Sequence, residues 1–78
     1  MRFLPGSTIE DRIDILNNLS SSFAQVNFDS GISYSIQALR LATQHGDQRR
    51  MGLTRYNLGN AYYFKMDFKK ALVSYLSP

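Results

Sequence analysis

The sequence predicts an all-α protein built from successive antiparallel helical hairpins. Apolar residues recur at the spacing of a helix face in four consecutive segments, and no stretch alternates apolar and polar residues for long enough to form a strand. The linkers between the segments are too short for anything except antiparallel neighbours. A chain of 78 residues is expected to form one domain, 1–78, with a thin core.

The first helix is expected over residues 8–26. Ser7 and Glu10 stand in the capping-box arrangement that marks a helix start. An apolar stripe then follows at helical spacing until Asn27 interrupts it, and its members are Ile9, Ile13, Leu16, Leu19 and Phe23. The stripe predicts a helix with one face turned to a core.

The second helix is expected over residues 29–45. Asp29 is its predicted N-cap, because a carboxylate can accept the free N–H groups of the first turn. Gly46 is the predicted left-handed residue at its end, where glycine is the usual choice. One face of this helix is apolar and consists of Ile32, Ile36, Leu39 and Ala42.

The third and fourth helices are expected over residues 48–65 and 67–76. Asp47 is the predicted N-cap of the third. Pro78 limits the fourth, since proline inside a helix removes a hydrogen bond and clashes with the preceding turn. The complete expectation is therefore four helices joined by tight turns.

The two halves of the chain match each other at a nearly constant offset. Phe28 falls on Phe68, and Gly31 on Ala71, at an offset of 40 residues. In the preceding helices the offset is 39, where Asn18, Leu19, Ser20 and Phe23 match Asn57, Leu58, Gly59 and Tyr62. Each half is therefore predicted to be one helical hairpin of a repeat protein.

Gly59 lies inside the third expected helix, where glycine costs about 1 kcal/mol relative to alanine. A helix that keeps such a glycine usually has a neighbour close to the missing side chain. We therefore expect the small residues at matching places to be buried where helices meet, and these are Ser20, Gly31, Gly59 and Ala71.

The run YNLGNAYY, residues 56–63, together with the residues after it, resembles the tetratricopeptide repeat (TPR) family, in the variety of about 40 residues that is found in bacterial signalling proteins. The second half carries the family pattern at Leu58, Gly59, Tyr62, Ala71 and Tyr75. The first half carries it at Leu19, Ser20, Phe23, Gly31 and Ala38, and departs from it at Ser35, where an aromatic residue is usual. The resemblance implies a TPR-like α-solenoid with repeat 1 at about 9–46 and a truncated repeat 2 at about 47–78.

The same resemblance implies a protein-binding module, in which the first helix of each repeat lines a concave groove for an extended or helical peptide. Asparagine can bond both the N–H and the C=O of a passing backbone, and tyrosine provides contact area at low entropy cost. The positions that correspond to groove residues are Asn17, Asn18, Ser21, Leu53, Tyr56, Asn57, Asn60, Tyr63 and Phe64.

Charge is unevenly distributed along the chain. Residues 1–39 carry a net charge of −2 and residues 40–78 a net charge of +5, which sum to the formal +3 of the whole chain. This asymmetry suggests either an anionic partner for the second half or head-to-tail contact between copies, while two solvated helix faces of differing charge are the simpler interpretation. Arg49, Arg50 and Arg55 are the residues that could meet an acidic partner.

The early end of the second repeat predicts a fragment of a longer TPR array, as in the input segment of a bacterial signalling protein. The alternative is a structural module that forms a homo-oligomer through its incomplete last repeat. A second alternative is a nucleic-acid-binding helix-turn-helix around Ala42 and Gly46. Asp47 and Gly52 argue against it, because each stands where that motif needs an apolar residue.

No catalytic site, metal site or cofactor is predicted. His45 is the only histidine and the chain has no cysteine, so no set of metal ligands can be assembled. No apolar run is long enough for a membrane span. The absence of cysteine does not identify a compartment, and both cytoplasm and periplasm remain open.

Overall fold

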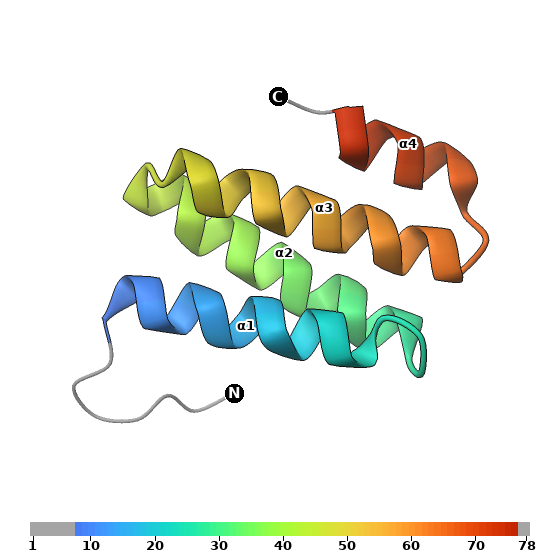
Figure 1. The fold of residues 1–78 in the computed structure, drawn as a ribbon, viewed down its shortest axis with the longest axis horizontal. Helices are drawn as coiled ribbons and strands as arrows, with labels where there is room; N and C mark the ends of the chain where they lie inside the picture. The colour runs from blue at the N-terminus through green and yellow to red at the C-terminus, as the bar shows by residue number, and fades with distance from the viewer. Residues whose placement is uncertain (1–7, 77–78) are drawn as a thin grey trace.

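The computed structural model describes residues 8–76, which form four helices and no strand (Figure 1). Helix α1 spans Ile9–Phe23, α2 Phe28–His45, α3 Gln48–Phe64 and α4 Phe68–Leu76. The predicted all-α class and the order of four helices are confirmed. Ser7, Ser77 and Pro78 lie outside the described residues.

The start of α1 differs from the prediction by one residue. Thr8 is the N-cap: its hydroxyl accepts from the Asp11 N–H over 3.1 Å, and the Asp11 carboxylate accepts from the Thr8 N–H over 3.4 Å. The capping box is therefore Thr8 with Asp11, and the predicted role of Glu10 in it is wrong. Glu10 instead bonds His45 at the far end of α2.

The turn between α1 and α2 begins earlier than predicted. The chain leaves α1 after Phe23, and the N–H groups of Val26 and Asn27 both bond the Phe23 carbonyl, at 3.0 and 2.8 Å. Asn27, rather than Asp29, caps α2, because its amide oxygen accepts from the Ser30 N–H over 3.2 Å. Because α1 ends at Phe23, the prediction of a first helix that continues to residue 26 is wrong.

The remaining helix ends follow the sequence signals closely. Gly46 adopts the left-handed conformation, with φ of 72°, and Asp47 caps α3 by accepting from the Arg50 N–H over 3.0 Å. Asp67 accepts from the Lys70 N–H over 3.3 Å, so it precedes α4 and is not its first residue. Short polar residues thus set the starts of all four helices.

The helices form two hairpins that stack on each other (Figure 1). Successive helices contact one another, and α1 also contacts α3, while α4 contacts α3 alone among the described helices. The main core lies between α1 and α2, with Met51 of α3 packed against it; its fully buried members are Ile13, Leu16, Ala38 and Ala42. The structure therefore places α1 and α3 side by side, with α2 crossing both.

All four small residues expected at helix contacts are buried. The Ser20 hydroxyl donates to the carbonyl oxygen of Gly31 over 2.9 Å and also bonds the Ser35 hydroxyl. An added Cβ at Gly31 would lie 3.1 Å from the Cα of Ala24, so even alanine there would require the Ala24 backbone to shift by a few tenths of an ångström. Ser35 is fully buried and bonds Ser20 at the position where the family pattern has an aromatic residue.

Candidate functional site

A polar hollow of about 260 Å³ lies between α1 and α3. Five of the nine residues predicted to line a peptide groove surround it. These five are Ser21, Tyr56, Asn57, Asn60 and Phe64; Ala24 and Gln25 complete the lining. The structure thus brings one predicted residue of α1 and four of α3 to a single place.

Helical spacing explains why the α3 residues converge. Tyr56, Asn60 and Phe64 are four positions apart, so they lie one above another on the same face of α3. Ser21 and Gln25 have the same spacing on the facing segment, where Gln25 follows the end of α1. Gln25 was not predicted, although its distance from Ser21 in the sequence was a usable signal.

The hydrogen bonds within the chain leave a defined donor and acceptor in this groove. Asn60 accepts through Oδ1 from the Tyr75 hydroxyl, and its Nδ2 has no hydrogen-bond partner among residues 8–76. Asn57 donates through Nδ2 to Asn17, and its Oδ1 likewise has no such partner in the described segment. One amide N–H₂ and one amide oxygen, three residues apart, therefore remain for a ligand.

Aromatic rings form the apolar part of the groove. Tyr56 is 57% exposed and Phe64 is 38% exposed, so both have free ring surface. The Tyr56 ring lies 6.0 Å from that of Tyr75, which holds it against α4. The groove thus combines central amide groups with aromatic walls.

Asn17 is placed differently from its prediction. Its side chain is 3% exposed and lies in the seam between α1 and α3, where Oδ1 accepts from Asn57 over 3.2 Å. Its Nδ2 is buried without a hydrogen-bond partner in the described part of the chain. Asn17 therefore holds Asn57 in position and does not itself line the hollow.

The other predicted groove residues also lie outside its lining. Asn18 is exposed on α1, and Leu53 is exposed on α3. Tyr63 belongs to an aromatic cluster, with its ring centre 5.8 Å from that of Phe64 and 5.5 Å from that of Phe68. This cluster extends from the edge of the groove toward α4.

The three arginines predicted to meet an acidic partner are not brought together. Arg50 is held inside the chain: its Nε and Nη2 donate to the Asp14 carboxylate at 2.9 and 3.0 Å, and its Nη1 donates to Asp47 at 2.8 Å. Hydrogen bonding by Arg50 lowers the pKa of the Asp14 carboxyl. Arg49 is exposed near the start of α3, while Arg55 is partly buried and lines a second hollow.

Two further observations concern metals and membranes. Residues 8–76 contain no cluster of three or more side chains of the kinds that ligate metals. No helix in the same range has the length and apolar character needed to cross a bilayer.

Comparison of the sequence with known protein families, with characterised proteins and with solved structures finds no match to the chain.

Proposed function

We propose that this chain is a TPR-like protein-binding module whose groove between α1 and α3 holds a peptide segment of a partner. The observation that supports this most strongly is the convergence of Ser21 with Tyr56, Asn57, Asn60 and Phe64 around one hollow. These residues come from the first helix of each hairpin, as the family resemblance implies.

The amide groups of the groove suit a peptide backbone. The unpaired Asn57 Oδ1 can accept from a backbone N–H, and the unpaired Asn60 Nδ2 can donate to a backbone C=O. Their internal bonds, to Asn17 and Tyr75, fix each amide plane before the ligand arrives. Such pre-organisation reduces the ordering cost of binding.

Selection of peptides from a random phage-displayed library tests the proposal without a known partner. A selected peptide is then titrated by calorimetry into the parent protein and three variants. Tyr56→Ala removes an aromatic wall, and Asn60→Asp keeps the acceptor for Tyr75 while it removes the free donor. Asn18→Ala is the control, because Asn18 is exposed on α1 outside the lining.

We expect Tyr56→Ala and Asn60→Asp each to weaken binding about tenfold, the effect of an interface residue worth about 1.4 kcal/mol. Asn18→Ala should change affinity by less than about twofold. If the library yields no binder, or if binders are insensitive to both groove variants, the proposed function is wrong.

Self-association is a second candidate, and it rests on the exposed apolar face of α4. Leu72 is 58% exposed and Leu76 is 72% exposed, and α4 has only α3 as a packed neighbour among the described helices. Exposed apolar surface of this kind marks contact sites. Light scattering should show dimers that Leu72→Glu converts to monomers; a parent protein that is monomeric at high concentration excludes this candidate.

A further inference from the structure

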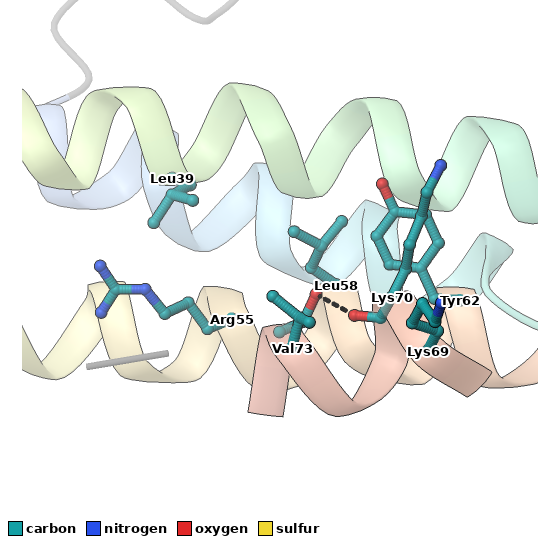
Figure 2. Close-up of a pocket in the computed structure, with 8 residues that line it drawn as sticks. Leu39, Arg55, Leu58, Tyr62, Lys69, Lys70 and Val73 are labelled. Carbon is teal, nitrogen blue, oxygen red and sulfur yellow. Dashed lines mark hydrogen bonds between the residues drawn. The ribbon is translucent and has the colours of Figure 1, made fainter. Parts of the chain in front are cut away.

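A second hollow lies between α2, α3 and α4 and has a volume of about 420 Å³ (Figure 2). It uses a different face of α3 from the first groove, with Arg55, Leu58 and Tyr62 in place of Tyr56 and Asn60. Its remaining lining consists of Leu39, Lys69, Lys70, Val73 and Ser74.

The centre of this hollow is apolar. Leu39 comes from α2, Leu58 from α3 and Val73 from α4, so each of the three helices contributes one aliphatic side chain. Leu39 and Leu58 are only partly buried, and Val73 is 62% exposed. An apolar side chain placed here would cover aliphatic surface that now faces water.

Cations lie at both ends of the hollow. Figure 2 shows Arg55 at one end and Lys69 with Lys70 at the other, with Leu58 and Val73 between them. No carboxylate of residues 8–76 pairs with Arg55 or Lys69. The Lys70 Nζ lies 3.8 Å from Asp67 Oδ2 and 5.7 Å from the centre of the Tyr62 ring, so its ion pair is loose.

Two other cations of the described segment are held by carboxylates, in contrast to Arg55 and Lys69. Arg50 bonds both Asp14 and Asp47, and Lys65 Nζ lies 2.9 Å from Asp29 Oδ1. The positive charge that the chain leaves without a close carboxylate therefore includes the rim of this apolar hollow.

We infer that this hollow, the α2/α3/α4 groove, binds an acidic peptide segment that places an apolar side chain between two groups of carboxylates. A single lipid headgroup or fatty-acid carboxylate would reach the cations at one end only. A nucleic-acid backbone would leave the aliphatic centre uncovered. A peptide with acidic residues on both sides of an apolar one matches both ends and the centre, and the site is separate from the groove between α1 and α3.

A designed probe tests this inference on the whole chain. The probe is a fluorescein-labelled peptide in which glutamates flank a central pair of leucines, and fluorescence anisotropy gives its affinity. The matched peptide carries glutamine in place of each glutamate. Arg55→Gln removes the cation at one end, Lys69→Gln with Lys70→Gln removes those at the other, and Arg49→Gln is the charge-matched control on the exposed start of α3.

We expect the acidic probe to bind more tightly than the glutamine peptide and to weaken as salt rises. Arg55→Gln and the double lysine variant should each reduce affinity about 3- to 10-fold, as the loss of a charge-assisted contact does, while Arg49→Gln has little effect. Amide shifts in NMR spectra should centre on Leu39, Leu58 and Val73. Circular dichroism confirms that each variant is folded.

Three results would overturn the inference. One is an acidic probe that causes no amide shifts at a concentration of about 1 mM. Another is an equal loss of affinity with Arg49→Gln and Arg55→Gln, which would indicate attraction to net charge. The third is binding of laurate to the same residues by a protein that does not bind the peptide.

Discussion

Asn57 donates a hydrogen bond from Nδ2 to Oδ1 of Asn17 over 3.2 Å, which joins α3 to α1. Both side chains are buried, and the two residues are 40 positions apart in the sequence. The bond fixes how the first helices of the two hairpins lie against each other. It therefore also fixes the groove that Asn57 lines.

Asn57→Ala should destabilise the protein by about 1–3 kcal/mol, because the Oδ1 atom of the buried Asn17 then loses its hydrogen-bond donor. Asn18→Ala, at an exposed position of the same helix as Asn17, should change the free energy of unfolding by less than about 0.5 kcal/mol. Urea denaturation followed by circular dichroism compares the two. Equal midpoints for both variants would show that the bond has no structural role.

Met66→Gly should stabilise the protein by about 0.5–1 kcal/mol. Met66 is the second residue after the end of α3 and has φ of 68°, a left-handed conformation that strains any residue with a Cβ. It is 76% exposed, so little packing is lost. Gly46 ends α2 with nearly the same φ, 72°. Gly46→Ala should accordingly destabilise by about 1 kcal/mol. Thermal unfolding measures whether Met66→Gly raises the melting temperature and Gly46→Ala lowers it. A lower melting temperature for Met66→Gly would show that the left-handed conformation of Met66 is not strained.

Stability should fall as the solution becomes acidic, through the Arg50 network. Hydrogen bonds from Arg50 lower the pKa of the Asp14 and Asp47 carboxyls below their ordinary value of 3.8. A lowered pKa in the folded state gives stability that is present above the unfolded value and lost as the pH falls below it. Asp14→Asn should therefore be less stable near neutral pH and lose less on acidification.

Urea midpoints measured across the acidic range from neutral pH test this expectation. Asp29→Asn is the control, since Asp29 is strongly exposed beside Lys65. Parallel profiles for the parent and Asp14→Asn would mean that the Asp14 ion pair contributes nothing to the pH dependence.

Gly59→Leu should destabilise the protein by about 1–3 kcal/mol through overpacking. A Cβ at this position would lie 2.5 Å from Cε1 and 2.6 Å from Cδ1 of the Tyr75 ring, so the ring must move. Its hydroxyl would then lose the bond to Asn60. Urea denaturation and NMR spectra test this contact between position 59 and the Tyr75 ring. A urea midpoint equal to that of the parent, with unchanged Tyr75 ring signals, would show that the two residues are not in contact.

The helix interiors were predictable because apolar periodicity and short polar caps act locally. Gly46 and Asp47 were read correctly for this reason. The start of α1 was predicted one residue too early, because the pair Ser7 and Glu10 and the pair Thr8 and Asp11 form equivalent capping patterns one residue apart. The end of α1 depends on tertiary structure, where the backbone at Ala24 packs against Gly31.

The candidate site was predictable on α3 and less so on α1. Four-residue spacing alone places Tyr56, Asn60 and Phe64 on one face. The burial of Asn17 depends on how α1 and α3 meet, which no local pattern encodes. The engagement of Arg50 likewise depends on Asp14, which lies 36 positions earlier in the chain.

The helices of the chain approach closely at small residues, and a pair of glycine-to-alanine substitutions measures this approach most directly. Gly31 and Gly52 both lie inside helices, but a Cβ at Gly31 would lie 3.1 Å from the Cα of Ala24, whereas a Cβ at Gly52 meets nothing within 4 Å. Alanine stabilises an open helical site by about 0.5–1 kcal/mol, and overpacking costs about 1–3 kcal/mol. Urea denaturation should therefore show a higher midpoint for Gly52→Ala and a lower one for Gly31→Ala. If both substitutions raise the midpoint alike, the helices do not meet as described.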